Sequence, residues 1–301
     1  MIDLSMHLGR TIKHVRQQKG ILGKEIAAAI DLTPSQLTKI ENETQSISAE
    51  LFIKILSYLN MSFDEFCYLS GENLFKARAQ TRKYIKTIPT KKNKAAIKSI
   101  IHQVKNYSDK FNEPYFEHTY AILNARLKLE ETDYNYDIAR PLLSPIKKYL
   151  DNVETWFDYE VALFINSYYM FEYDVALAKG TETLYKIKNS YSPERYNELN
   201  NQLYFNLALY ALDKRQTSQD ALDFITRCTV NLTHTNIRMR LILRILQQIA
   251  YFQLDCCEYS EQTILKTLNG VELLELADLH DYLCSLLRKH GIILNNKKMH
   301  D

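Results

Sequence analysis

The sequence predicts an all-α protein, and three observations support this fold class. The chain of 301 residues contains only seven glycines and six prolines, a composition that favours helices joined by short turns. Apolar residues recur at the three- and four-residue spacings of amphipathic helices. Helical segments in the second half repeat at intervals of about 40 residues. We therefore expect a five-helix helix-turn-helix domain at residues 1–70, a basic linker at 71–90, and an α-solenoid of tetratricopeptide-like helix pairs at 91–301.

The composition indicates an ordinary soluble globular protein, with 46% apolar and 25% charged residues. The five cysteines are odd in number and lack paired metal-ligand spacing, which indicates reduced thiols in a cytoplasmic protein. No basic and then apolar leader opens the chain, and no run approaches about 18 consecutive apolar residues. We expect neither secretion nor a membrane span.

The helix-turn-helix follows a first helix that we expect at residues 5–18, where apolar residues are spaced by four and three. Its own first half is an Ala-rich helical run from Leu22 to Ile30, and Asp31 and Leu32 then leave the pattern and turn the chain. Two more helices complete the domain. Ser62 and Glu65 form a capping box for the last of them.

The second helix of the motif opens at Thr33, a good N-cap, with Pro34 at the first helical position, where a missing N–H costs nothing. Leu37 and Ile40 form an inward pair. Such a helix lies in the major groove of DNA, where Gln suits adenine and Lys suits guanine. The residues that we expect to meet DNA are Thr33, Pro34, Ser35, Gln36, Thr38 and Lys39, together with Lys24 of the preceding helix.

One further pair supports this interpretation. Arg16 and Glu41 stand where phage-repressor-type domains hold a bridging ion pair, and an Arg fork matches a carboxylate bidentately. A helical hairpin of this length also occurs as a piece of a bundle. The cap, the inward apolar pair and the Arg–Glu pair agree independently, so together they favour the DNA-reading motif.

Charge is distributed unevenly, although the formal net charge is only +2. Residues 1–70 carry seven basic and eight acidic side chains, so this domain is nearly neutral. The stretch 73–108 has ten basic residues and no acid, whereas residues 109–301 have a net charge of −6. A basic collar at 73–108 would neutralise DNA phosphates, and a merely solvated helix face is the alternative.

The stretches LGRTIKHVRQQKG and LTPSQLTKIENETQSISAELFIKILSYLNMSFDEF resemble the head of the Rgg family of peptide-responsive transcription regulators. A later echo of this family is VETWFDYEVALFIN at 153–166. The resemblance implies a helix-turn-helix head and a tetratricopeptide-like body. It also implies that residues on the inner helices of that body bind a short signalling peptide.

Four helical segments of the expected solenoid carry an amide side chain at matching positions. These residues follow one another at intervals of 42, 40 and 42: Asn124, Asn166, Asn206 and Gln248. The second helix of each pair is expected at 137–150, 174–189, 218–232 and 259–269. Equivalent positions of a stacked solenoid line one continuous face, usually the concave one.

Such amides suit the backbone of an extended peptide, because each both gives and takes a hydrogen bond. A buried amide also ties one helix to the next, and the sequence leaves both roles open. Arg126, Arg240 and Arg244 are candidates for binding a peptide carboxylate, because Arg makes planar bidentate contacts. Each of them could instead pair with an acid on a neighbouring helix.

Enzymatic activity is not expected, because the phosphate-loop, serine-hydrolase, zinc-protease and dinucleotide motifs are absent from the sequence. His280 and Cys284 share a helix face, but a lone pair of this kind more often packs than binds zinc. We expect no metal and no cofactor.

The expected function is that of a cytoplasmic DNA-binding transcription regulator controlled by a short signalling peptide. A homodimer is expected because helix-turn-helix domains read two half-sites one helical turn apart, and the Leu-rich segment 271–290 is the candidate dimer surface. One alternative is a constitutive repressor whose repeat domain only dimerises or binds a protein partner. Another is an adaptor that has lost DNA binding, which the nearly neutral head keeps open.

Overall fold

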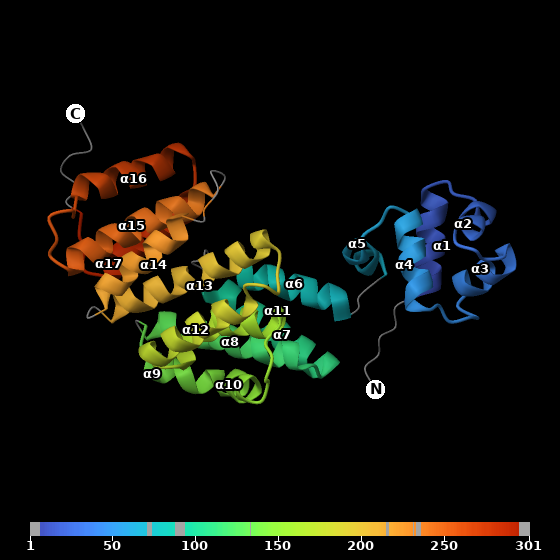
Figure 1. The fold of residues 1–301 in the computed structure, drawn as a ribbon, viewed down its shortest axis with the longest axis horizontal. Coiled ribbons are helices and arrows are strands. Elements are labelled where there is room, and N and C mark those ends of the chain that lie inside the picture. Colours follow the sequence, from blue (N-terminus) through green and yellow to red (C-terminus); the bar gives the residue numbers. More distant parts are fainter. Residues whose placement is uncertain are drawn as a thin grey trace. The chain divides into compact units, whose positions relative to one another are not determined.

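The computed structural model describes residues 7–70, 74–87, 94–132, 134–214, 217–230, 232 and 236–294. These residues form helices and turns, with no strand among them (Figure 1). The expected all-α class is confirmed. The chain divides into two compact units, which are described separately here: the first comprises α1 to α6, most of α7 and the start of α8, and the second comprises the remainder.

Five helices form the helix-turn-helix head, and each contributes a fully buried side chain to one core. Their bounds are α1 (Leu8–Gln18), α2 (Gly23–Ala29), α3 (Pro34–Glu41), α4 (Ala49–Tyr58) and α5 (Phe63–Leu69). In chain order the buried side chains are Ile12, Ile26, Leu37, Ile55 and Phe66. The apolar spacing of the sequence therefore places the core as expected.

Helices α1 and α3 approach closely at Gly9. A Cβ atom on this residue would lie 2.0 Å from the carbonyl oxygen of Ile40. Any larger residue would push α3 away, so the absence of a side chain at Gly9 sets this crossing. A second fixed contact joins the C-terminal ends of α1 and α4, since Lys19 Nζ donates to the Leu59 carbonyl oxygen at 2.6 Å.

The segment that we expected to be a basic linker contains a helix that packs against its neighbours. Its partners within the first unit are α7 and the beginning of α8, through Leu74, Ala77, Phe111 and Phe116. Residues 71–73 and 88–93 lie outside the described residues. The bounds of the three helices are α6 (Leu74–Thr87), α7 (Lys94–Phe111) and α8 (Pro114–Glu131).

The body, the part of the second unit from Tyr120 onward, is a series of paired helices around one continuous apolar core. Neighbouring helices pack in chain order, and α13, α15 and α17 also pack side by side (Figure 1). This arrangement of alternate helices is that of a tetratricopeptide-like solenoid. The elements are α9 (Tyr136–Ala139), η2 (Arg140–Leu143), α10 (Ser144–Asp151), α11 (Asp158–Ser167), η3 (Tyr168–Met170), α12 (Tyr173–Ile187), α13 (Pro193–Asp213), α14 (Ser218–Val230), α15 (Ile237–Gln253), α16 (Glu261–Leu273) and α17 (Ala277–Lys289).

Several helices end in a left-handed residue that is not glycine. The backbone φ angle is 58° at Asp31 and 61° at Glu43 in the head, and 52° at Asp255 and 54° at Glu275 in the body. This conformation favours glycine, because a Cβ atom crowds the following carbonyl oxygen. These helix ends therefore hold local strain.

Candidate functional site

The start of α3 is fixed by a reciprocal capping box. Thr33 Oγ1 accepts a hydrogen bond from the Gln36 backbone N–H at 3.2 Å, and Gln36 Oε1 accepts one from the Thr33 backbone N–H at 2.8 Å. Pro34 occupies the first helical position. The sequence analysis found the cap but missed the returning bond, for which the Thr-x-x-Gln spacing was the signal. The Thr33 hydroxyl also donates to Gln36 Oε1, at 2.9 Å, so the amide is held against the start of its own helix.

The side chains expected to meet DNA all lie on the outside of the head. They are exposed in every case: Lys24, Thr33, Pro34, Ser35, Gln36, Thr38 and Lys39. The Thr38 hydroxyl donates to the Pro34 carbonyl oxygen at 2.9 Å, which turns it back onto its own helix. By contrast, Leu37 and Ile40 are each only 2% exposed.

A buried ion pair holds α1 against α3. Arg16 Nε donates to Glu41 Oε1 at 2.6 Å and Nη2 donates to Oε2 at 3.0 Å, so the contact is bidentate. The two side chains are 12% and 5% exposed. Arg16 Nη1 also donates to the Ile21 carbonyl oxygen at 2.8 Å, and the hydrogen bond with Glu41 raises the pKa of the guanidinium. The pair thus fixes the angle at which α3 is presented.

The basic collar is partly neutralised by acids that lie outside the 73–108 window. Arg78 pairs with Glu113 at 2.5 Å, Lys105 pairs with Asp109 at 2.5 Å, and Lys98 lies 3.6 Å from Glu131. The side chains of four expected collar residues lie outside the described part of the chain: Lys86, Lys91, Lys92 and Lys94. Although the 73–108 stretch contains no acidic residue, its basic side chains therefore form ion pairs with acids from other parts of the chain.

The four amide residues of the body have different partners. Asn124 and Asn166 each donate to the carbonyl oxygen four residues earlier in their own helix, at 2.9 and 2.7 Å. Asn206 donates to the Ile165 carbonyl oxygen of α11 at 2.6 Å, and so links two repeats. Gln248 is 5% exposed, and its Oε1 accepts from the Ser260 backbone N–H at the start of α16 at 2.7 Å.

Arg126 of α8 lies close to tyrosines from distant parts of the body. Burial raises the pKa of Tyr169 in η3 and of Tyr282 in α17, and the nearby Arg126 guanidinium opposes both rises. Arg126 is half-buried. Of the other two candidate arginines, Arg244 is exposed, and Arg240 donates to the Leu232 carbonyl oxygen at 2.8 Å. The sequence analysis missed these tyrosines because only the fold brings them to Arg126.

Family models match both parts of the chain. One described as a helix-turn-helix covers residues 12–66, and one described as the C-terminal domain of the HTH-type transcriptional regulator Rgg covers residues 75–284. The chain belongs to the Rgg family. The family is one of transcriptional regulators, in keeping with the resemblance drawn from the sequence.

Solved structures of similar fold include members of this family. The pheromone receptor Rgg2 of Streptococcus dysgalactiae is 20% identical, with 94% of this chain and 99% of that chain covered and a TM-score of 0.62. PlcR of Bacillus thuringiensis, in complex with the peptide PapR7 and DNA, is 17% identical, with coverage of 94% and 99% and a TM-score of 0.61. A transcriptional regulator of Listeria monocytogenes is 17% identical, with coverage of 94% and 97% and a TM-score of 0.65. These likenesses confirm the two-part helical fold.

This Rgg-family body also contains a buried cluster of titratable groups that the sequence analysis did not find. Asp213, at the end of α13, accepts a hydrogen bond from the Tyr136 hydroxyl. The same carboxylate lies 2.5 Å from Lys289 Nζ and 3.6 Å from His290 Nε2. The side chains of Asp213, Lys289 and His290 are 8%, 17% and 4% exposed. The cluster joins the ends of α13 and α17.

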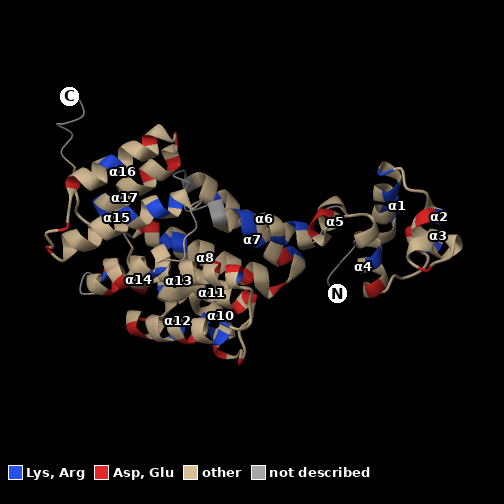
Figure 2. Ribbon diagram, turned by 45° about the horizontal axis from the view of Figure 1, so that its top comes forward, with Lys and Arg blue, Asp and Glu red and all other residues tan. Residues whose placement is uncertain are grey.

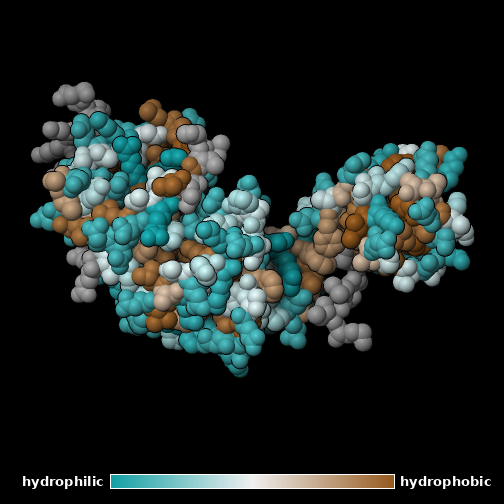
Figure 3. All heavy atoms as spheres, viewed as in Figure 1, coloured by the Kyte–Doolittle hydropathy of each residue, from teal (hydrophilic) through white to brown (hydrophobic). Residues whose placement is uncertain are grey.

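The Leu-rich C-terminal segment divides into a buried and an exposed part. Leu279, Leu283 and two further leucines of α17 belong to the core. Leu273 and Leu274, at the end of α16, are 85% and 51% exposed. On the face of the protein that Figure 3 shows, hydrophobic residues of the body form several patches among hydrophilic ones. Leu273 and Leu274 are therefore the exposed large apolar side chains of the predicted dimer surface.

The described residues give no sign of a metal site or a membrane span. Cys284 Sγ lies 3.8 Å from His280 Nδ1, but no group of three or more metal-ligating side chains occurs in the described part of the chain. Among the described helices, none combines the length and the apolar composition that crossing a bilayer requires.

Proposed function

We propose that this Rgg-family regulator is a cytoplasmic homodimer that binds operator DNA through its head and responds to a short signalling peptide held by its body. The observation that carries the DNA half is the fixed presentation of α3. Its outward residues are exposed, while the bidentate Arg16–Glu41 pair and the Thr33–Gln36 box set its orientation and its first turn. No enzymatic role is proposed.

The DNA half is tested with variants of α3 in the full-length protein. Lys39→Ala and Gln36→Ala should each cost about 1–3 kcal/mol of sequence-specific binding and relax the preference at one operator position. Lys54→Ala is the control, because Lys54 is exposed on α4 and pairs with Glu50 of the same helix at 2.9 Å. An unchanged site preference in both α3 variants would refute this placement of the recognition helix.

For the peptide half, we propose that Asn124, Asn166 and Arg126 contact the ligand. The side-chain nitrogens of both asparagines are bonded within their helices, while their oxygens have no hydrogen-bond partner among the described residues. A peptide backbone N–H would satisfy such an oxygen. Arg126 suits the peptide carboxylate or an acidic side chain. In support, PlcR, a protein of the same fold, was crystallised with both a peptide and DNA.

The remaining candidate residues of the body are weaker candidates for ligand contact. Asn206 and Gln248 are bonded to other helices of the body, and Arg244 is exposed. Asn124→Ala and Asn166→Ala should weaken the peptide response and leave peptide-free DNA binding intact. Gln248→Ala should instead destabilise the body. If the two Asn variants respond normally while Gln248→Ala does not, the peptide lies deeper in the array than we propose.

The coupling between the two halves is proposed to run through the dimer. A peptide that binds one curvature of the body more tightly shifts the population toward that curvature, and thereby changes the spacing of the two heads. The exposed leucines Leu273 and Leu274 are the proposed dimer contact. A constitutive repressor is the second candidate, because every amide of the set has a partner within the body. It predicts DNA binding that ignores peptides.

A further inference from the structure

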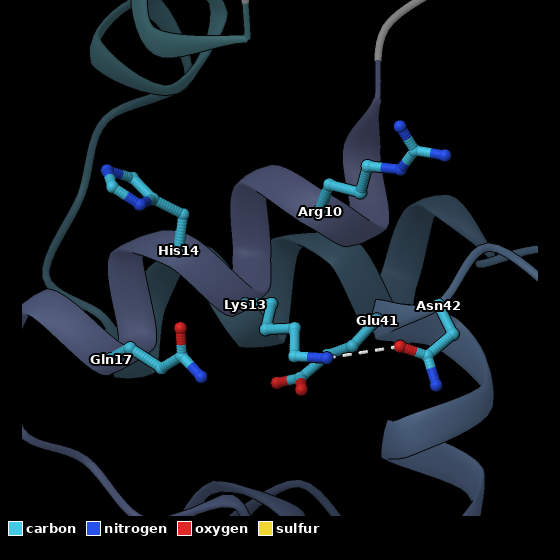
Figure 4. A pocket seen from close by; sticks show the side chains of 6 residues that line it. All are labelled: Arg10, Lys13, His14, Gln17, Glu41 and Asn42. Atoms are coloured by element: carbon cyan, nitrogen blue, oxygen red, sulfur yellow. Dashed lines mark hydrogen bonds between the residues drawn. The ribbon is translucent and has the colours of Figure 1, made fainter.

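The head contains a pocket whose lining does not include the predicted DNA-reading residues of α3. It has a volume of 390 Å³ and lies between the outer face of α1 and the C-terminal end of α3 (Figure 4). Four of its residues come from α1 and two from the end of α3: Arg10, Lys13, His14, Gln17, Glu41 and Asn42.

The position of this pocket follows from helix periodicity. On α3, Asn42 lies on the same outward stripe as Lys39 and Ser35, at spacings of three and four residues. On α1, Arg10, Lys13 and Gln17 form a similar stripe at spacings of three and four. The two stripes meet where Lys13 Nζ donates to Asn42 Oδ1 at 3.1 Å (Figure 4). The pocket therefore continues the face that carries the DNA-reading residues.

The charge of the pocket is positive because its one acidic residue, Glu41, is already paired. The carboxylate of Glu41 is held by Arg16, which contacts it from within the core, and Arg10 Nε pairs with the neighbouring Glu43 at 3.2 Å. The partner of Lys13 is a neutral amide, and within the described residues no carboxylate pairs with it. One full positive charge thus remains at the pocket mouth.

Ion pairing also lets a nearly neutral head carry a positive face. Three of its basic residues, Arg10, Arg16 and Lys54, pair with carboxylates, and Lys19 binds a carbonyl oxygen at the end of α4. The three others have no carboxylate partner among the described residues: Lys13, Lys24 and Lys39. Figure 2 shows basic residues on both α1 and α3. Net charge near zero therefore does not argue against DNA binding.

We propose that the pocket binds a backbone phosphate of the operator. The N-terminal part of a recognition helix reads the bases, so its C-terminal end lies toward the sugar–phosphate backbone. Lys13 supplies the charge, and the amide nitrogens of Asn42 and Gln17 are neutral donors of the kind that DNA phosphates accept. This inference rests on the proposed DNA binding and adds a contact to it that carries no sequence information.

The test is the salt dependence of operator binding by full-length Lys13→Gln. Each phosphate contact contributes about −0.9 to the slope of log K against log salt, and the proposed homodimer loses one contact in each of its two heads. The variant should therefore lose about 1.8 units of slope and bind about 60-fold more weakly near 0.1 M salt. The loss should be equal on the operator and on a scrambled duplex. Lys13→Arg should keep the wild-type slope, because it keeps the charge. Lys54→Gln is the matched control.

One outcome would overturn the pocket assignment and leave the proposed function standing. In it, the wild-type protein binds its operator specifically, and Lys13→Gln shows the same slope of log K against log salt as the wild type. Wild-type protein without specific DNA binding would overturn both. Inorganic phosphate alone separates a small-anion site from a DNA contact. If phosphate stabilises wild-type protein against heat but not Lys13→Gln, and the DNA slopes are equal, the pocket binds a free anion and the inference is wrong.

Discussion

The head and the body each use one buried carboxylate to join an early helix to a later one, but the two carboxylates differ in how many partners they serve. Glu41 gives both oxygens to one guanidinium, that of Arg16. Asp213 is shared by the Tyr136 hydroxyl, Lys289 and His290. A single bidentate partner fixes an angle, whereas a shared carboxylate gathers several segments around one charge. The carboxylate of the head thus fixes the orientation of α3, whereas the carboxylate of the body joins distant repeats.

The largest expected effect is that of Asp213→Asn. The substitution removes the buried carboxylate that Lys289 Nζ approaches at 2.5 Å, and breaking such a pair costs about 3 kcal/mol or more. Trp156, the only tryptophan of the chain, packs on Phe164 in the body, so its fluorescence reports unfolding of the body alone. In urea, the Trp156 transition should move to a lower midpoint. Asp223→Asn, at an exposed position on α14, is the control, and equal midpoints in the two variants would contradict a structural role for Asp213.

Glu41→Gln is expected to have the second largest effect, and to confine it to the head. The amide oxygen still accepts one bond from Arg16, so we expect a loss of about 2 kcal/mol in the stability of the head. Operator binding and part of the far-UV circular dichroism should disappear at lower urea, while the Trp156 transition stays in place. Glu50→Gln, in an exposed pair with Lys54, should change neither signal. A shift of the Trp156 transition in Glu41→Gln would show that the two regions unfold together.

A smaller effect is expected from the capping box of α3. Thr33→Ala removes the hydroxyl that accepts from the Gln36 N–H, and the loss of such a cap costs about 1 kcal/mol. Thr38→Ala is a matched control, because that hydroxyl only donates back to its own helix. Differential scanning calorimetry of the head transition measures both. The importance of the box is refuted if the two variants melt alike.

The smallest effect, of opposite sign, is expected at the end of α16. Glu275 is exposed and adopts a φ angle of 54°, so Glu275→Gly should stabilise the body by about 0.5 kcal/mol or more by relieving the left-handed strain. Lys266→Gly, at an exposed position within the same helix, should destabilise it by about 1 kcal/mol. Loss of stability in Glu275→Gly would mean that its side chain has a role that outweighs the strain.

The helices of the head could be predicted because their signals in the sequence are local. The Thr33 cap, the Ser62–Glu65 box and the inward Leu37–Ile40 pair each depend on residues within four positions, and all three occur in the structure. What could not be predicted depends on distant contacts. The need for glycine at position 9 arises from the Ile40 carbonyl, and the acids that neutralise the collar lie beyond its window.

In the body, even more of the structure depends on contacts between distant residues, which the sequence did not predict. Its helix pairs follow from apolar periodicity and the spacing of the amides, and α12, α14 and α16 lie close to the expected second helices. The helix expected at 137–150 is instead divided into α9, η2 and α10, because Pro141 and Pro145 interrupt the helical hydrogen bonds. The partners of the amides do not follow from that spacing, because Asn206 bonds to a carbonyl 41 residues away and Gln248 to the next helix. Nor could spacing indicate that Asp213 meets Lys289, since the superhelix brings them together. Repeat length predicts a solenoid, but not which of its polar residues face a ligand.

The central claim, that one region reads DNA under the control of a peptide held by the other, is tested most directly by a single titration. Fluorescently labelled DNA from upstream of the gene and its neighbours is titrated with the purified full-length protein, with and without short synthetic peptides encoded nearby. We predict specific binding whose affinity or footprint changes with one peptide, and a change that Asn166→Ala reduces. Specific binding that ignores every peptide would contradict the claim and favour the constitutive repressor, and binding that is indifferent to sequence and to salt would favour the adaptor.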